Sequence, residues 1–258
     1  MSEHDKPWAP GTPCWVDLVT DDIEAARAFY GELFGWDSAE GSPEFGGYST
    51  ASLKGHAVAG FAPPPPGQSV PTAWNTYLAT DDADATAAKI TANGGQLLFP
   101  VMDVADVGRM GVGTDPVGGM VAFWQSGTHT GFGLANEPGS DVWNEYFTAD
   151  YEGAKKFYGA VFGVTFTEMG DENFTYSSMH VNGNVVGGLG AARADGFTGW
   201  RTYFAVTDAD EAAATVQRLG GSVVKPVEDS PFGRMGHLAD AHGAQFAVIG
   251  YTGDAGGG

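Results

Sequence analysis

The sequence predicts an α+β protein of four βαβββ modules, paired into two domains with concave sheets and outer helices. Three observations lead to this: a long repeat, a weaker repeat inside it, and β-like runs that alternate with helical patterns. The long repeat is carried by identical residues, which include Trp15 and Trp143, Tyr30 and Tyr158, Trp74 and Trp200, Tyr77 and Tyr203, and Arg109 and Arg234. The spacing is 128 at the first pair (143 minus 15) and falls to 125 at the last (234 minus 109). A period of this length indicates a duplicated domain rather than a solenoid.

The weaker repeat marks the start of a helix in each module. The run Leu-x-Thr-Asp-Asp at 18–22 recurs at 78–82. Each copy follows a β-like run and precedes a helical pattern. The first helix has Asp21 or Asp22 as N-cap, Gly35 as its stop and one apolar face, made of Ile23, Ala26, Tyr30, Leu33 and Phe34. The second buries Ala83, Ala87 and Ile90 and ends at the glycine pair 94–95.

Glycine turns separate the β-like runs that follow the helices. These runs are Gly47–Leu53, Ala57–Ala62, Gln96–Val101, Arg109–Thr114 and Met120–Gln125. The repeat spacing drops between Gly60 and Trp74, across four prolines, and again between Pro100 and Gly108. Deletions collect where the backbone is exposed, so both stretches are predicted to be loops.

The modules span about residues 12–62, 72–125, 141–191 and 199–250. The predicted domains are residues 11–126 and 140–251, with a linker at 127–139 and a flexible tail at 252–258. Two modules side by side form a curved sheet with helices outside and an open concave face, which we call a cup. Two arrangements stay open at this point. Adjacent modules within each half can share a cup, or modules can pair across the halves.

Composition limits the classes of partner. Hydrophobic residues make up 43% and charged residues 17% of the 258 residues, as in globular proteins. The formal net charge of −20 disfavours nucleic acid and anionic membrane surfaces, and no apolar run is long enough to span a bilayer. Cys14 is the single cysteine, so no intramolecular disulfide forms, and a buried position is expected for it. We expect a cytoplasmic protein with a small-molecule ligand, either a monomer that is an internal pseudo-dimer or a homodimer.

The motifs of the first half resemble those of a known superfamily. They are Asp-x-x-x-Ala-x-x-Phe-Tyr-x-x-Leu-Phe-Gly at 22–35, Gly-Arg-Met-Gly at 108–111 and Asp-Pro-x-Gly at 115–118. Together they resemble the vicinal oxygen chelate superfamily, which includes glyoxalase I, extradiol dioxygenases, fosfomycin-resistance enzymes and bleomycin-binding proteins. The resemblance covers nearly all of Pro13–Tyr251. Within it, the runs at 15–18 and 143–145 are similar to a two-domain actinobacterial subgroup described as glyoxalase-like proteins or hydroxylases.

The resemblance implies a divalent metal in each cup, held by His, Gln or Glu of the first and last strands. The corresponding positions in this chain are Trp15, Gly60, Asn75 and Ala122 in the first half, and Trp143, Gly188, Arg201 and Ala247 in the second. Apart from Asn75, none of these side chains supplies a usual donor to a divalent cation. We therefore expect no metal and no cofactor. The six histidines, at positions 4, 56, 129, 180, 237 and 242, are expected in the tail, loops and strand ends.

Strand alternation predicts what lines each cup instead. The predicted first cup contains Trp15, Asp17, Asn75, Tyr77 and Trp124. The predicted second cup contains Trp143, Glu145, Arg201, Tyr203 and Gln245. Asp17 and Glu145 are the candidate catalytic residues, and the others are candidate ligand-binding residues. Aromatic faces with one carboxylate suit a flat, partly polar organic ligand.

Structural alternatives accompany these assignments. The tryptophans can simply fill an obsolete metal site, and the acids can be paired within the fold, as Glu145 with Arg201. Arg109 and Arg234 are interpreted as structural residues that close the turns before Asp115 and Asp240.

The favoured function is a metal-free protein that sequesters or modifies a small aromatic or drug-like metabolite, in secondary metabolism or resistance. One alternative is a divalent-metal-dependent lyase, isomerase or dioxygenase with displaced ligands. Another is a degenerate, non-catalytic scaffold.

Overall fold

The computed structural model describes residues 3–67, 69–172, 174–192 and 196–250. These residues form two mixed sheets, one from each half, and four α-helices. The helices are α1 (Ile23–Phe34), α2 (Ala83–Ala92), α3 (Tyr151–Phe162) and α4 (Ala209–Arg218), with a short 3-10 turn at Pro43–Phe45. The first half contains the strands β1 (Pro13–Val19), β2 (Asp37–Ser38), β3 (Ser49–Leu53), β4 (His56–Ala62), β5 (Ala73–Ala79), β6 (Gln96–Leu97), β7 (Met102–Val104), β8 (Gly108–Thr114) and β9 (Met120–Ser126). The second contains β10 (Asp141–Thr148), β11 (Thr165–Glu168), β12 (Tyr176–Val181), β13 (Asn184–Ala191), β14 (Gly199–Val206), β15 (Ser222–Ser230), β16 (Gly233–Ala239) and β17 (Gln245–Gly250).

Each helix begins at an aspartate, as the repeat predicts. The carboxylates of Asp22, Asp82, Asp150 and Asp208 accept hydrogen bonds from backbone N–H groups of the first turn. These bonds satisfy donors that have no partner within the helix. The helices α1 and α3 end at Gly35 and Gly163, which have φ of 74° and 73°. Glycine has no Cβ to clash in this left-handed region, so both helices stop there.

Adjacent modules share a sheet, which decides between the two arrangements left open by the sequence. The strand order of the first sheet is β2-β3-β4-β1-β5-β9-β8-β6, and that of the second is β11-β12-β13-β10-β14-β17-β16-β15. The first strands of the two modules pair antiparallel at the centre, β1 with β5 and β10 with β14. The last strand of each module lies parallel to its first strand. Each cup therefore belongs to one half.

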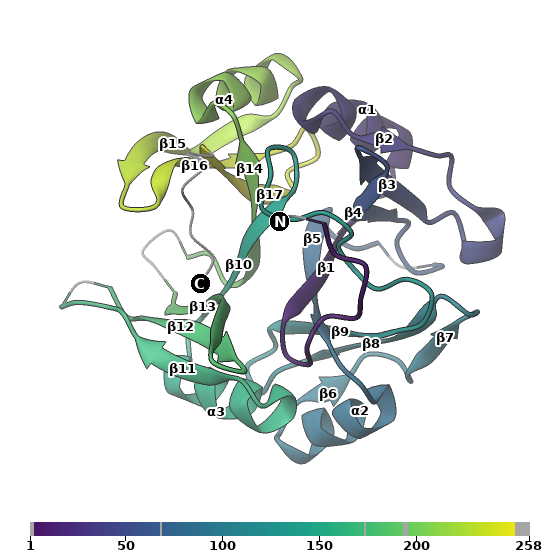
Figure 1. Ribbon diagram of the computed structural model, residues 1–258, viewed down its shortest axis with the longest axis vertical. Helices are drawn as coiled ribbons and strands as arrows, with labels where there is room; N and C mark the ends of the chain where they lie inside the picture. Colours follow the sequence, from purple (N-terminus) through teal and green to yellow (C-terminus); the bar gives the residue numbers. More distant parts are fainter. Residues whose placement is uncertain (1–2, 68, 173, 193–195, 251–258) are drawn as a thin grey trace.

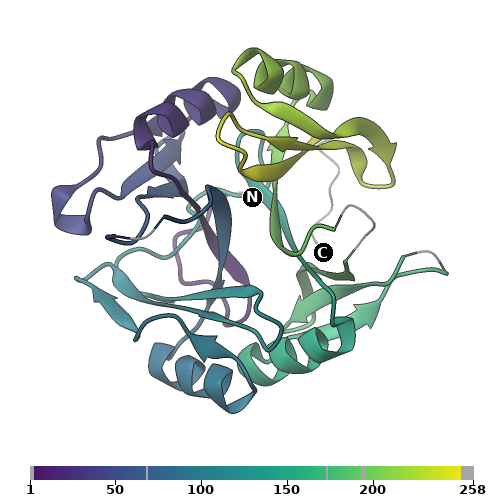
Figure 2. The same ribbon diagram turned by 180° about the vertical axis from the view of Figure 1, so that it is seen from behind.

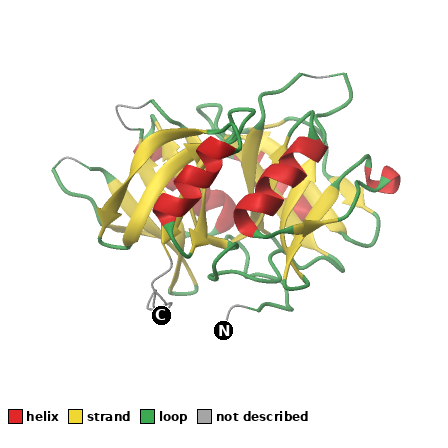
Figure 3. Ribbon diagram, turned by 90° about the horizontal axis from the view of Figure 1, so that it is seen from above, coloured by secondary structure: helices red, strands yellow, loops and turns green. Residues whose placement is uncertain are grey.

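The two halves pack against each other through their central strands and their helices. Figure 1 shows the first sheet on the right, the second on the left, and β1, β5, β10 and β14 in the middle. Helix α1 lies beside α4 and α2 beside α3, and these pairs are also seen from behind in Figure 2. The view from above in Figure 3 shows one such helix pair between the strands of the two sheets.

The buried core joins the halves. One hydrophobic cluster unites Tyr30 and Trp74 with Phe204, and the other unites Phe123 with Phe157. Two buried hydrogen bonds also cross the interface. The hydroxyl of Tyr30 donates to Asp240 at 3.0 Å, and the hydroxyl of Tyr146 donates to Asp115 at 2.5 Å.

Several expectations are corrected. The expected strand Gln96–Val101 is only two residues long, and the expected loop after Pro100 contains the short strand β7. Arg109 and Arg234 do not close the turns before Asp115 and Asp240. Each guanidinium group instead forms two ion pairs, one with the first turn of a helix and one with a neighbouring strand. Arg109 pairs with Asp84 of α2 and Asp103 of β7. Arg234 pairs with Asp210 of α4 and Asp229 of β15.

Two further expectations concern the ends of the chain and its single cysteine. Cys14 is buried, as expected. The predicted tail, residues 252–258, lies outside the described residues. No helix among the described residues is long and apolar enough to cross a membrane.

Candidate functional site

Strand register brings the predicted residues of the first cup onto one face. Trp15 of β1 lies opposite Tyr77 of β5, and Asp17 lies opposite Asn75. On the outer sides, Asp17 pairs with Gly60 of β4, and Tyr77 pairs with Ala122 of β9. Directly opposed residues in a sheet point to the same side, so the positions implied for a metal meet at the centre of this cup.

Asp17 is held by two partners within the first cup. Its carboxylate accepts a hydrogen bond from the hydroxyl of Tyr77 at 2.9 Å and from the amide of Asn75 at 3.0 Å. Burial raises the pKa of Asp17 to about 6, because removing the carboxylate from water disfavours its charged form, and the two hydrogen bonds oppose this shift. The pKa of Tyr77 is raised well above its usual value by burial and by the charge of Asp17. The acid thus has protein donors of its own.

A tyrosine that the sequence analysis missed fills the centre of the first cup. A Cβ atom added to Gly60 would lie 1.8 Å from the hydroxyl oxygen of Tyr48, so this phenol occupies the space above the glycine. The indole N–H of Trp15 donates to the same hydroxyl at 2.8 Å.

The segment after β9 covers the first cup. The ring of His129 packs edge-on against Trp15 at 4.4 Å and against Trp124 at 5.6 Å between ring centres. Phe132 packs on Trp15 at 5.7 Å, and the indole of Trp124 donates to the carbonyl of His129. Burial lowers the pKa of His129 to about 4. Trp15 is only 4% exposed, so the first cup is filled by its own side chains.

The second cup repeats the central geometry. Trp143 lies opposite Tyr203, Glu145 lies opposite Arg201 and beside Gly188, and Tyr203 pairs with Ala247. The hydroxyls of Tyr176 and Tyr203 donate to the two carboxylate oxygens of Glu145. A Cβ atom on Gly188 would lie 1.8 Å from the hydroxyl of Tyr176, which is the repeat equivalent of Tyr48.

Arg201 has an environment with no parallel in the first cup. Its side chain is 2% exposed. The guanidinium carbon lies 4.0 Å from the ring centre of Phe197 and 5.2 Å from that of Phe147. It forms no ion pair with Glu145 in the described part of the chain, and Nε finds no hydrogen-bond partner there. The pairing of Glu145 with Arg201 that the sequence suggested is therefore not seen in this geometry.

The second cup is also more open than the first. Trp143 is partly exposed, whereas its equivalent Trp15 is buried. A hollow of about 350 Å³ lies at the rim and is lined by Gly196, Phe197, Thr198, Val224 and Gln245. Gln245, the first residue of β17, thus stands at the rim rather than at the centre.

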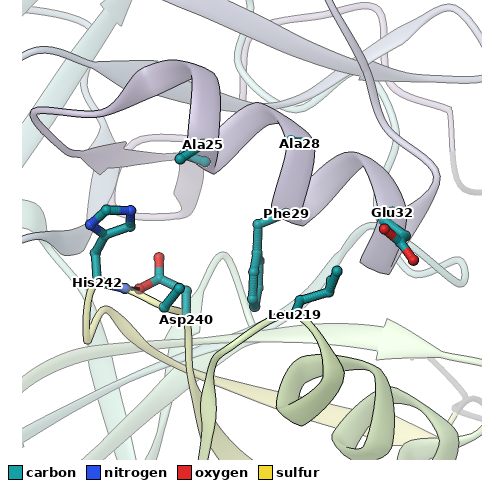
Figure 4. Close-up of a pocket in the computed structure, with 9 residues that line it drawn as sticks. Ala25, Ala28, Phe29, Glu32, Leu219, Asp240 and His242 are labelled. Carbon is teal, nitrogen blue, oxygen red and sulfur yellow. Dashed lines mark hydrogen bonds between the residues drawn. The ribbon is translucent and has the colours of Figure 1, made fainter.

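Another hollow, of about 280 Å³, lies away from both cups (Figure 4). It lies between α1 and the turn that joins β16 to β17, and is lined by Phe29, Leu219, Asp240 and His242 among others. None of the predicted site residues contributes to it.

Two of the six histidines lie at the cups. His129 covers the first cup, and His237 lies in the middle of β16, 4% exposed and opposite Ala247 of the second cup. The expectation of a loop or strand-end position is wrong for His237, because the sequence around a histidine does not indicate whether it faces the buried side of a strand.

The repeat could have revealed Tyr48 and Tyr176, which are 128 positions apart (176 minus 48).

The donor set does not fit a divalent cation. Across the described residues, no three His, Cys, Asp or Glu side chains are grouped so that they could hold a metal ion. The implied positions carry two indole rings, two alanines, two glycines that tyrosines occlude, the amide of Asn75 and the cationic Arg201. At the centre of each cup a carboxylate accepts hydrogen bonds from phenolic hydroxyls, and of the two cups the second leaves its tryptophan partly exposed.

Comparison with known proteins gives consistent results. A family model described as Glyoxalase/Bleomycin resistance protein/Dioxygenase superfamily matches residues 14–123 and again residues 141–248. The chain is 43% identical over 248 residues to "Putative glyoxylase CFP32" of Mycobacterium tuberculosis, covering 93% of this chain and 94% of the relative. It is 37% identical over 274 residues to "Anthracycline biosynthesis protein DnrV" of Streptomyces peucetius, covering 97% and 98%.

Among solved structures, the Mn(II)-bound glyoxalase from Novosphingobium aromaticivorans aligns with a TM-score of 0.65 at 14% identity, over 96% of this chain and 83% of that one. BphC, a halotolerant catechol dioxygenase, aligns with a TM-score of 0.63 at 15% identity, over 93% and 87%. At these identities the likeness concerns the fold alone.

Proposed function

Because the chain belongs to the glyoxalase/bleomycin resistance protein/dioxygenase superfamily, we propose that it binds a small aromatic metabolite in its second cup, without a divalent metal, and sequesters or modifies it there. The observation that carries this proposal is the contrast between the two cups. Trp15 is buried beneath His129 and Phe132, whereas Trp143 is partly exposed. A hollow of about 350 Å³ is lined by Phe197 and by Gln245, which lies two residues before Ala247 on β17. The first cup is a filled core, and the second offers both an aromatic surface and space.

The chemistry of the second cup supports a flat ligand with polar groups. Trp143 and Phe197 supply aromatic area, while Glu145 supplies an acceptor that Tyr176 and Tyr203 fix in position. Relatives named for anthracycline biosynthesis agree with this class, since anthracyclines are fused aromatic ring compounds.

The donor chemistry favours binding without a metal over the metalloenzyme alternative. A divalent cation needs several oxygen, nitrogen or sulfur donors at fixed distances. The centre of the second cup offers Glu145, whose two oxygens accept hydrogen bonds from Tyr176 and Tyr203. A carboxylate fixed by two phenolic hydroxyls is suited to hydrogen bonding with a polar group of an organic ligand rather than to holding a cation.

A matched pair of substitutions tests the site. Trp143→Phe and Trp15→Phe remove the same indole from equivalent positions of the two cups. With an anthracycline or 2-naphthoate as probe, isothermal titration is expected to show one site per chain, weakened about tenfold or more by Trp143→Phe. Trp15→Phe is expected to retain the affinity and to lower the melting temperature instead, because Trp15 is a packed core residue.

Prior treatment with a chelator is expected to leave the affinity unchanged, and elemental analysis of protein purified without chelator is expected to give no stoichiometric metal. If the chelator abolishes binding and added Fe, Zn, Ni or Mn restores it, the result would support the metal-dependent enzyme instead. Absence of binding to every aromatic probe would favour a non-catalytic scaffold.

A further inference from the structure

The two cups differ in charge at one central position. Asn75 in the first cup corresponds to Arg201 in the second, 126 positions on (201 minus 75). The amide of Asn75 is used inside the protein, because it donates to Asp17 at 3.0 Å. Arg201 faces the equivalent acid, Glu145, across the same strand pair but does not take over this role.

The Nε–H group of Arg201 is buried and finds no hydrogen-bond acceptor in the described part of the chain. Only 2% of the side chain is exposed, and the contacts seen are ring faces, at 4.0 Å for Phe197 and 5.2 Å for Phe147. A ring face attracts the cation but offers no acceptor to an in-plane N–H donor such as that of Nε. A buried polar group without an acceptor is costly, so a cation kept in this state indicates a partner outside the fold.

The position of Arg201 connects it to the proposed binding space. Phe197, which stacks on the guanidinium, is also part of the wall of the hollow of about 350 Å³. The guanidinium therefore lies one ring away from the space that a ligand would enter. Glu145 lies directly across the strand pair from Arg201, so a ligand that meets the guanidinium also lies near this carboxylate.

From this arrangement we infer that Arg201 is the specificity-determining residue of the second cup and that the ligand presents an anionic oxygen group, a carboxylate or a phenolate, on an aromatic ring. The inference rests on the proposed function. A guanidinium recognises such a group through charge-assisted, often bidentate hydrogen bonds, while the attached ring can stack on Phe197 or Trp143.

Two probes of the same shape test the inference. Isothermal titration of the full chain with 2-naphthoate and with neutral 2-naphthamide is expected to show at least tenfold tighter binding of the anion. Arg201→Asn, which installs the residue of the equivalent position, is expected to abolish this preference by weakening naphthoate binding at least tenfold, with naphthamide changed less than threefold. Arg201→Lys is expected to retain part of the preference, since the charge stays but the planar fork is lost.

Arg234→Asn is the control, because it removes one arginine from an exposed ion-pair network of the same module and should leave both affinities unchanged. Equal binding of the two probes to the wild type, or a preference that survives in Arg201→Asn, overturns the inference while the proposed function stands. If neither probe nor an anthracycline binds, the proposed function fails as well. If Arg201→Asn does not fold, the inference is tested by two measurements: the preference of the wild type for naphthoate over naphthamide, and the reduction of that preference in Arg201→Lys.

Discussion

At the scale of single residues, the repeat-equivalent acids of the cups occupy different surroundings. Asp17 is buried in a filled cup and satisfied by Asn75 and Tyr77. Glu145 lies in the more open cup, beside a buried arginine. We therefore favour a structural role for Asp17 and retain Glu145 as the candidate ligand-facing acid.

The raised pKa of Asp17 makes stability depend on pH. With a pKa of about 6 in the folded protein and 3.8 as its reference, the folded state binds more protons between about pH 4 and 6. The free energy of unfolding therefore falls as pH rises through this window, by up to about 3 kcal/mol from this group. Asp17→Asn removes this pH-dependent contribution to the free energy of unfolding. Urea denaturation at pH 4 to 7 is expected to show the variant gaining stability relative to wild type as pH rises. A constant difference would contradict this pKa.

At the scale of elements, the four aspartate N-caps fix where the helices begin and thus where each strand-to-helix turn leaves its cup. The carboxylate of Asp82 accepts from the N–H of Ala85 at 2.9 Å, and those of Asp22 and Asp150 likewise accept from the residue three positions on. Asp208 accepts from the N–H groups two and three positions on. This local pattern was predictable, because Asp at an N-cap followed by a 3.6-residue apolar period is a strong helix-start signal.

Removing one cap tests the contribution of this pattern. Asp82→Ala is expected to lower the free energy of unfolding by about 1 kcal/mol, because the first-turn N–H loses its acceptor. Its exposed neighbour Asp81 provides the control, and Asp81→Ala is expected to stay within about 0.5 kcal/mol of wild type. Chemical denaturation of both variants at one pH measures the difference. Equal losses would mean that the charge near the helix, rather than the cap bond, matters.

At the scale of the whole molecule, the shared core predicts that the two halves unfold as one cooperative unit. Each hydrophobic cluster contains residues of both sheets, and buried tyrosine–aspartate hydrogen bonds cross the interface in both directions. The side chains of Thr76 and Thr202, which are repeat equivalents, both donate to Asn144 at 3.0 Å near the centre of this interface. Neither half can expose this surface without losing much of its core.

Tyr146→Phe probes this coupling. The substitution leaves one oxygen of the buried Asp115 without its donor, and we expect a loss of about 1–3 kcal/mol. Because the interface is shared, differential scanning calorimetry is expected to show a single transition at lower temperature rather than two. Tyr151→Phe, whose hydroxyl bonds Glu168 and Ser177 within the second half, serves as the control with a smaller shift. A profile that splits into two transitions would show that the halves unfold independently.

The duplication, the helix starts and the strand faces that line the cups follow from the sequence alone, because strand alternation and helix caps act between neighbours in the chain. The same patterns put Trp15 with Tyr77 and Glu145 with Arg201 on shared faces, in agreement with the register. The fold was needed to show that adjacent modules share a sheet, that Tyr48 and Tyr176 fill the cup centres, and that His129 covers one cup. These contacts join residues distant in sequence, and their geometry depends on how the strands pack, which no local pattern encodes.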